Sequence, residues 1–268
     1  MNRWRWVVLA LVPLGCGESP PPTCGGETLF GAPNASTGLG ADACGTTCEC
    51  GGDPWTPPSY PAADRAELRT WRLAEPFAAL AADPYAADVP APATGDDPVC
   101  ALLPEGDHTY RLATFPTPQE ATRAGGQLTH FGGCGVCSTL DDLAVYMEQP
   151  DLTEPVRACG LANLAAPVED LVTCIEAIGF THPCAQVWAY NTLHTRDLCG
   201  AVCLASLDAP YNNADGSIND CLQCDEDASG PVFKAVAGRT RRNTGLPSSM
   251  CRPCSEVRPV EHFYSSPE

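Results

Sequence analysis

Cys134 and Cys137 have the spacing in this chain that most directly suggests chemistry. They lie three residues apart in His130-Phe-Gly-Gly-Cys134-Gly-Val-Cys137-Ser, between a strand-like and a helix-like segment. A cysteine at a helix N-terminus meets backbone N–H groups and the positive end of the helix dipole, which favour the thiolate. In thiol–disulfide exchange, Cys134 would then attack, Cys137 would resolve the mixed disulfide, and His130 would be the neighbouring acid or base.

The same segment resembles two families of thiol enzymes. Cys134-Gly-Val-Cys137, which follows a strand, helix, strand pattern over residues 109–131, is similar to the Cys-Gly-Xaa-Cys active site of thioredoxin-type oxidoreductases. Gly132-Gly-Cys134-Gly-Val-Cys137 resembles a segment of papain-like proteases, and this resemblance implies Cys137 as nucleophile and His262 as base. We prefer a third interpretation, in which Cys134 and Cys137 are framework cysteines, because ten other cysteines lie in the same domain.

A second candidate site is a cluster of positive charge near the C-terminus. Lys234, Arg239, Arg241 and Arg242 lie within nine residues of a chain whose net charge is −18. Arginine forks match carboxylates, phosphates and sulfates, so the cluster could contact an acidic protein or an anionic ligand. The acidic run 225–227 could instead pair with it inside the molecule. We prefer intramolecular pairing. If the protein does bind a partner, this cluster is the surface that we expect the partner to contact.

The remaining cysteines predict a disulfide framework. Seventeen cysteines divide into Cys16 alone, four in residues 24–50 and twelve in residues 100–254. Both later groups are even, as complete pairing in an exported chain requires. Cys199 and Cys203 lie one helical turn apart, so we expect each to pair with a different neighbour. Besides Cys134 and Cys137, the framework comprises Cys24, Cys44, Cys48, Cys50, Cys100, Cys159, Cys174, Cys184, Cys199, Cys203, Cys221, Cys224, Cys251 and Cys254.

The N-terminus predicts export. Arg3 and Arg5 precede an apolar run over residues 6–12, which is the order of a secretory signal. The run is too short for a membrane span, which needs about 20 residues. The closing Leu14-Gly15-Cys16 resembles the lipobox of bacterial lipoproteins. This resemblance implies cleavage before Cys16, acylation of Cys16, for example with palmitate, and attachment to a bacterial membrane on the periplasmic side or at the cell surface.

Charge and ligand spacing exclude several functions. Removal of the signal peptide leaves 13 basic and 33 acidic residues, which would repel nucleic acid and anionic headgroups. We expect neither a metal nor a cofactor. His130, His182 and His194 lack metal-ligand spacing, and residues 213–219 match only the middle of an EF-hand loop, because carboxylates are missing at its ends.

The elements that would position these residues give an α+β fold, mainly α. We predict a signal peptide (1–15), a lipidated tether (16–22), a small Cys-rich module (23–52) held by two of its own disulfides, and a Pro/Ala-rich linker (53–98) with a short helix near 64–82. The main domain (99–268) begins with strands at 109–115 and 127–131 around a helix at 118–124. A disulfide-stapled array follows, with helices at 138–148, from 153, and at 167–178, 181–206 and 229–245.

These observations together predict a membrane-anchored, extracytoplasmic, cysteine-rich lipoprotein. We expect it to be a partner-binding, ligand-binding or structural module without catalysis. The alternative is a thiol–disulfide oxidoreductase that acts through Cys134 and Cys137.

Overall fold

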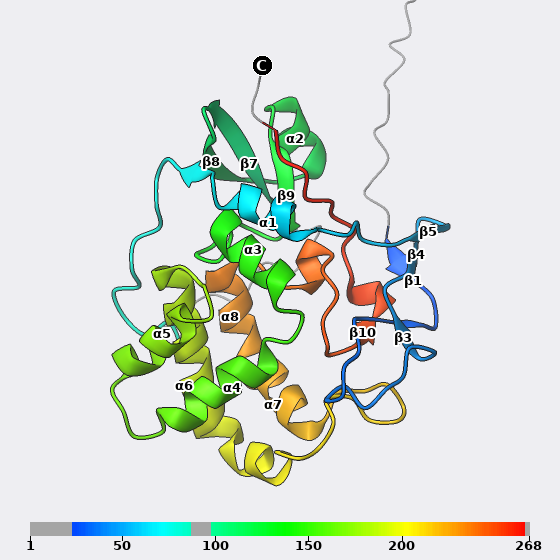
Figure 1. Cartoon of the computed structure of the whole chain (residues 1–268), viewed down its shortest axis with the longest axis vertical. Coiled ribbons are helices and arrows are strands. Elements are labelled where there is room, and N and C mark those ends of the chain that lie inside the picture. Colours follow the sequence, from blue (N-terminus) through cyan, green and yellow to red (C-terminus); the bar gives the residue numbers. More distant parts are fainter. Residues whose placement is uncertain (1–22, 87–97, 266–268) are drawn as a thin grey trace, which may run out of the picture.

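The computed structural model describes residues 23–86 and 98–265 (Figure 1). The predicted signal peptide, the tether with Cys16, and linker residues 87–97 lie outside them. The described residues form eight α-helices, a four-stranded sheet and two small three-stranded sheets, so the prediction of an α+β, mainly α fold is confirmed. None of these helices combines the length and apolar character that crossing a bilayer requires.

The four-stranded sheet is built around a strand that the sequence patterns did not reveal. The sheet has the order β6-β8-β7-β9, and β7 (Val99–Gly106) runs antiparallel to both β8 (Thr109–Phe115) and β9 (Gln127–Phe131). Helix α2 (Pro118–Arg123) connects β8 to β9 across β7, and β6 is Arg72–Leu73. Residues 99–102 are all buried and do not alternate, and Pro104 further obscures the pattern of β7.

Six helices pack below this sheet (Figure 1). They are α3 (Leu140–Glu148), α4 (Thr153–Ala162), α5 (Val168–Glu176), α6 (His182–Ala205), α7 (Asp220–Ala228) and α8 (Gly230–Ala237). Helix α7 was not predicted, although the Asn219 side chain caps it by accepting a hydrogen bond from Leu222 N. The helix predicted over 229–245 is wrong beyond residue 237, because Gly238 adopts φ +73° and ends α8.

The core lies between the sheet and the helices. Helix α3 contributes Leu140, Leu143 and Val145, all without exposed surface, and Tyr110 reaches it from β8 to accept a hydrogen bond from Leu140 N. Eight disulfides cross-link this core and its surroundings, and they pair every cysteine of the described residues. Such a density of disulfides is typical of exported, extracellular-type domains.

Two disulfides overturn the prediction that residues 23–52 close on themselves. Only Cys24–Cys50 is internal, because Cys44 and Cys48 pair with Cys251 and Cys254. Strand β2 (Leu29–Phe30) lies between β3 (Cys44–Gly45) and β10 (Arg252–Pro253), while β1 (Cys24–Gly25), β4 (Cys48–Cys50) and β5 (Asp53–Trp55) form the other small sheet. The segment has few large apolar side chains of its own, so the C-terminal chain completes its core.

The prediction that residues 53–98 form a linker is wrong for the described part of that segment, which packs on the main domain, although the short helix predicted within it is present. Helix α1 (Ala62–Leu68) packs on α3, and Trp71 is buried in the main core. Further along, Leu80 N donates to Gln186 Oε1 at 2.6 Å, and Tyr85 stacks on His194 with ring centroids 4.3 Å apart. Buried aromatic residues therefore hold this proline-rich chain on the main domain.

Candidate functional site

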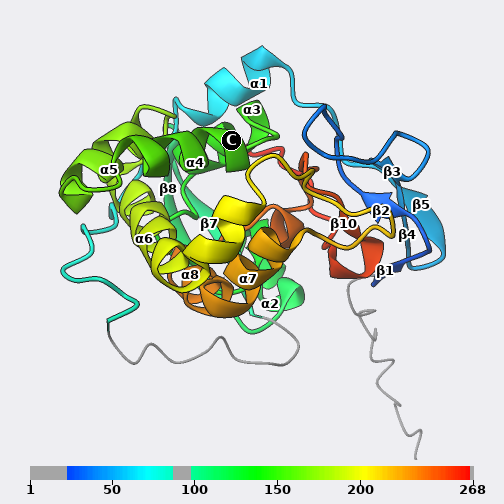
Figure 2. The ribbon, with the colours of Figure 1, turned by 90° about the horizontal axis from the view of Figure 1, so that it is seen from below.

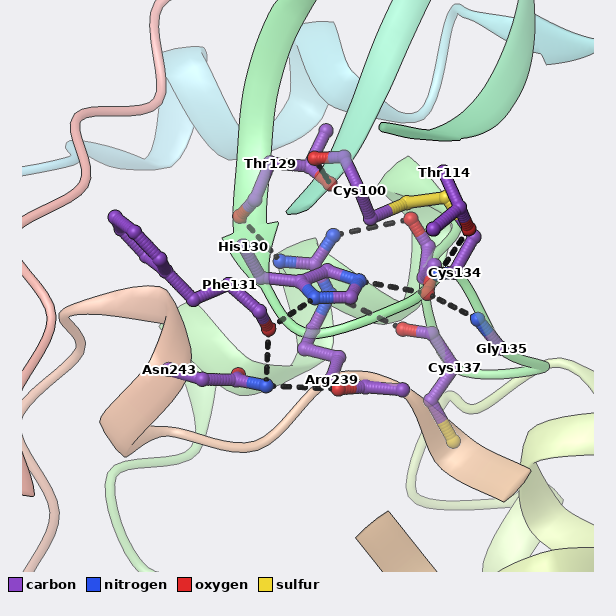
Figure 3. The surroundings of a disulfide bond; sticks show 12 residues. Cys100, Thr114, Thr129, His130, Phe131, Cys134, Gly135, Cys137, Arg239 and Asn243 are labelled. Atoms are coloured by element: carbon purple, nitrogen blue, oxygen red, sulfur yellow. Dashed lines mark hydrogen bonds between the residues drawn. A yellow bond between two sulfur atoms is a disulfide. The ribbon is translucent and has the colours of Figure 1, made fainter. Parts of the chain in front are cut away.

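Cys134 and Cys137 belong to two different disulfides. Cys134 pairs with Cys100 on β7 (Figure 3). Cys137 pairs with Cys184 in the first turn of α6. The expected attacking and resolving pair is therefore not formed, and the nucleophile implied by the papain-like resemblance is also occupied. His262 is not placed to act as the base that the papain-like resemblance implies, because its ring is buried and hydrogen-bonded to Thr244 O and Tyr264 Oη. The preferred interpretation, a structural framework, agrees with this pairing.

His130 is a buried structural residue, in contrast to its expected acid–base role. Its Nδ1 lies 2.8 Å from Phe131 O and its Nε2 lies 2.7 Å from Ser138 Oγ. A carbonyl only accepts, so Nδ1 donates to Phe131 O and Ser138 donates to Nε2. Burial lowers the pKa of His130 well below its ordinary value, and the charge of Arg239 adds to this effect. Ser138 and His130 resemble a nucleophile and base, but neither has exposed surface through which a substrate could enter.

Arg239 is also internal and does not belong to a docking surface. It has no exposed surface, and its guanidinium donates to three backbone carbonyls, Cys137 O at 3.0 Å, Thr129 O at 3.2 Å and Ser138 O at 3.0 Å (Figure 3). A Cβ at Gly238 would lie 2.5 Å from Gly135 N, so glycine is needed for the close approach that brings Arg239 inside. Arg239 holds β9 against the turn that precedes α3.

The other cluster residues divide between an ion-pair network and a single unpaired guanidinium. Glu226 lies 3.2 Å from Lys234 and 2.7 Å from both Arg242 and Arg252. Burial alone would raise the pKa of Glu226, but these three cations lower it to about 2. The predicted pairing with the acidic run is present in part: among the described residues Glu226 alone of the run forms these pairs, with Lys234 and Arg242 of the cluster and with Arg252 as an additional partner. Within the described residues, Arg241 has no carboxylate at ion-pair distance and donates to the carbonyls of Pro247 and Gln149.

Beside this cluster, the helices enclose a large apolar pocket. We call it the helical pocket; its volume is about 430 Å³, and its walls are α4, α6, α7 and α8 together with Tyr146 of α3 and the chain around 240–252. Figure 2 shows these four helices from below, with α4, α7 and α8 each beside α6. Small-molecule sites typically measure about 300–1,000 Å³ and are mostly apolar, so the helical pocket has the size and character of a binding site.

The floor of the helical pocket is aromatic and contains two unusual polar atoms. Trp188 packs edge-to-face on Phe233 with ring centroids 4.7 Å apart, and Tyr146 is only 2% exposed. Tyr146 Oη and Trp188 Nε1 are buried and interact with each other, with no other hydrogen-bond partner among the described residues. Burial raises the pKa of Tyr146, so its hydroxyl stays protonated at neutral pH.

The mouth of the helical pocket is lined by exposed leucines. Leu161, Leu164, Leu204 and Leu207 are 44%, 55%, 65% and 41% exposed, and all four line the pocket. They come from α4 and α6 and from the chain that follows each helix. Single exposed leucines are ordinary, but a cluster at the rim of an apolar cavity marks an interaction site. Sequence analysis did not identify this site. Its one local signal is that α6 carries leucines on exposed faces as well as buried ones.

The part of the chain that the structure describes contains no candidate metal site. No cluster of three potential metal-binding side chains exists within residues 23–86 and 98–265. The EF-hand-like residues form a polar turn in which Asp215 Oδ1 accepts hydrogen bonds from Ser217 N and Ser217 Oγ. Asp215 therefore caps its own turn.

Comparison with known proteins gives one match. A family model described as "Family of unknown function" matches residues 168–260, about a third of the chain. The matched region contains α5 to α8 and the Glu226 network, hence three of the four helical walls of the pocket. No curated protein and no solved structure matches the chain.

Proposed function

We propose that the protein is an exported lipoprotein whose disulfide-stabilised domain binds an apolar small molecule in the helical pocket and performs no catalysis. Acylation at Cys16 would hold the domain at a membrane, on the periplasmic side or at the cell surface. The observation that carries the binding proposal is the helical pocket, with its aromatic floor and leucine mouth.

The disulfide pairing supports a binding module over an oxidoreductase. A redox-active thiol must be accessible and must have a nearby resolving cysteine. Cys137 has no exposed surface, and Cys134 is joined to a strand of the central sheet. Both disulfides instead fix the turn from which α3 begins, and α3 carries Tyr146 to the pocket floor. Rigid walls favour binding, because a pre-formed site avoids the entropic cost of ordering side chains.

The proposal is tested by blocking the pocket. Gly200 lies on the pocket-facing side of α6, and a Cβ added there would meet no atom within 4 Å. The variant Gly200→Phe should therefore fill the pocket without a clash. Gly200→Ala is the matched control, because it adds a side chain too small to occupy the pocket.

The assay is a titration of the oxidised domain with N-phenyl-1-naphthylamine, which fluoresces in apolar surroundings. We expect one site per molecule in the wild type and in Gly200→Ala, and at least a tenfold weaker affinity in Gly200→Phe. Equal binding by all three proteins, or no binding by the wild type, would refute the assignment of the pocket. The anchor is tested separately: Cys16→Ser should release the protein from membranes into the soluble fraction.

A further inference from the structure

Asp225 is a carboxylate of the helical pocket that the protein satisfies on one side only. It lies on α7, lines the pocket and forms no ion pair among the described residues. Its Oδ1 accepts hydrogen bonds from Thr195 Oγ1 and from Asn191 Nδ2, the latter at 3.1 Å. An ionised carboxylate accepts at both oxygens, yet Oδ2 has no partner within residues 23–86 and 98–265. This oxygen is therefore an unused acceptor.

A ligand can reach this oxygen. The fully enclosed side-chain atoms without a conventional partner in the described residues are Arg65 Nε, Tyr146 Oη and Trp188 Nε1. Asp225 Oδ2 is not one of them, so it keeps accessible surface although most of its side chain is buried. Burial raises the pKa of Asp225 despite the two hydrogen bonds to Oδ1, which shows that the carboxylate is incompletely stabilised. A further donor would stabilise its charged form.

The unused acceptor lies beside the aromatic floor of the pocket. Trp188, Asn191 and Thr195 line the pocket from one face of α6, because they are three and seven residues apart. Asn191 and Thr195, which hold Asp225, are about 5 Å and about 11 Å along the helix axis from Trp188. A molecule whose apolar body packs on the floor can thus place a polar group at Asp225.

The positive charges around the pocket leave no site for an anion. Arg241 donates to the carbonyls of Pro247 and Gln149. The other five basic residues of the lining form ion pairs, namely Arg157 with Glu154, Arg196 with Asp197, and Lys234, Arg242 and Arg252 with Glu226. An anionic ligand would lose its hydration without gaining a free counterion, and it would also meet the carboxylate of Asp225.

A cationic ligand is disfavoured as well. The network around Glu226 joins three cations to two carboxylates among the described residues, namely Lys234, Arg242, Arg252, Glu226 and Glu256. Its excess positive charge acts on Asp225, because the charge of Arg252 lowers the pKa of that carboxyl. Asp225 therefore balances the network, and an ammonium group beside it would restore the excess. A neutral donor leaves the balance unchanged.

We propose that the ligand of the helical pocket is an uncharged apolar molecule with a hydroxyl group, which donates a hydrogen bond to Asp225 Oδ2. The apolar body of the ligand lies on the aromatic floor and along the apolar walls. Asn191 and Thr195 position the carboxylate through its other oxygen. This inference rests on the proposed function, since it requires that the pocket binds an apolar molecule at all.

The headgroup is tested with compounds of matched size. Decanol, its isomer methyl nonyl ether, decanoate and decylammonium compete with N-phenyl-1-naphthylamine on the wild type at neutral pH. The ether keeps the oxygen and the apolar surface of decanol but has no donor. We expect decanol to bind about tenfold more tightly than the ether, as expected for one hydrogen bond to a charged group, and more tightly than both ions.

The outcomes separate this inference from the proposed function. Equal affinity for decanol and the ether would refute the hydroxyl site, and tighter binding of decanoate or decylammonium would refute the choice of an uncharged ligand. If the probe binds and no compound displaces it, the pocket assignment stands and the inference fails. Absence of probe binding would refute the proposed function itself.

The residue is tested with Asp225→Asn. Its carbonyl oxygen can still accept from Thr195 and Asn191, which turns the amide N–H group toward the pocket. An amide donates to an alcohol and to an ether alike, so the preference for decanol should fall from about tenfold to within twofold. Inhibition constants are corrected for the probe affinity of each variant.

The matched control is Asp227→Asn. Asp227 lies on the same helix and is exposed, does not line the pocket, and accepts a hydrogen bond from Gln223 Nε2 at 2.9 Å. This variant should keep the preference of the wild type. An unchanged preference in Asp225→Asn would overturn the proposal. The headgroup series on the wild type decides the proposal by itself if Asp225→Asn does not fold.

Discussion

Asp142 should make the stability of this protein fall as the pH rises from about 4 to about 6. The side chain has no exposed surface and connects the beginnings of two helices. Its carboxylate accepts hydrogen bonds from Thr139 Oγ1, the N-cap of α3, at 2.6 Å, and from Thr181 N at 2.8 Å and Thr181 Oγ1 at 2.9 Å at the N-cap of α6. Desolvation by burial outweighs these hydrogen bonds and raises the pKa of Asp142 from 3.8 to about 6.

The size of the effect follows from this shift. Between pH 4 and pH 6 the native state keeps a proton on Asp142 that the unfolded chain has released. Stability therefore decreases with rising pH across this window. A shift of about two pKa units corresponds to about 3 kcal/mol. The contribution is complete below about pH 4 and is lost above about pH 6.

The variant Asp142→Asn isolates this contribution. An asparagine cannot ionise, its carbonyl oxygen can still accept from Thr181 N, and the threonine hydroxyls can rotate to accept from its amide. Urea unfolding with the disulfides intact should show that the wild type loses up to about 3 kcal/mol more than the variant between pH 4 and pH 7. Asp141→Asn is the matched control, because Asp141 is only partly buried in the same helical turn and its pKa is raised less. Parallel stability curves for the wild type and Asp142→Asn would refute the reasoning.

Three further outcomes follow from the contacts described above. Tyr146→Phe removes a buried hydroxyl whose one interaction among the described side chains is with Trp188 Nε1, so the free energy of unfolding should change by less than about 1 kcal/mol; a loss of about 3 kcal/mol would mean that the hydroxyl has a stronger partner in solution. Arg239→Met leaves three carbonyls unpaired and should lower the free energy of unfolding in urea by at least about 3 kcal/mol. Replacement of a residue on a surface docking site would leave this free energy almost unchanged. Cys44→Ser should lower the free energy of unfolding by only about 2 kcal/mol, because Cys48–Cys254 still closes nearly the same loop of about 200 residues. Adding Cys48→Ser opens that loop and should lower the free energy of unfolding by about 5 kcal/mol more, as measured by thermal unfolding.

The fold was predictable from sequence wherever a local signal sets an element. Strands β8 and β9 have the predicted bounds, because each alternates or is closed by glycine, and α6 begins at the predicted Thr181 and Pro183. Strand β7 could not be predicted in this way, because it is buried on both faces. Its hairpin to β8 turns through Asp107 and His108, which both have positive φ although neither is the glycine that usually signals such a turn; the glycine, Gly106, stands one position earlier, at the end of β7.

The candidate site could not be predicted from the sequence for a related physical reason: its residues come together only in the folded structure. The environment of Cys134 depends on Cys100, which lies on the strand that the pattern did not reveal. Tyr146 and Trp188 are 42 positions apart in the chain, and only the folded core, in which the Phe180 ring contacts both of their rings, brings them to one pocket. The sequence shows how many basic residues the cluster has but not where their side chains lie, because Arg239 and Arg241 turn inward after α8 ends at Gly238.

The most direct test of the pocket assignment is a crystal structure of the oxidised domain saturated with N-phenyl-1-naphthylamine. We expect density for one probe molecule inside the helical pocket, between α4, α6, α7 and α8. Probe density only outside the helical pocket, or a pocket that stays without probe density at saturation, would contradict the assignment.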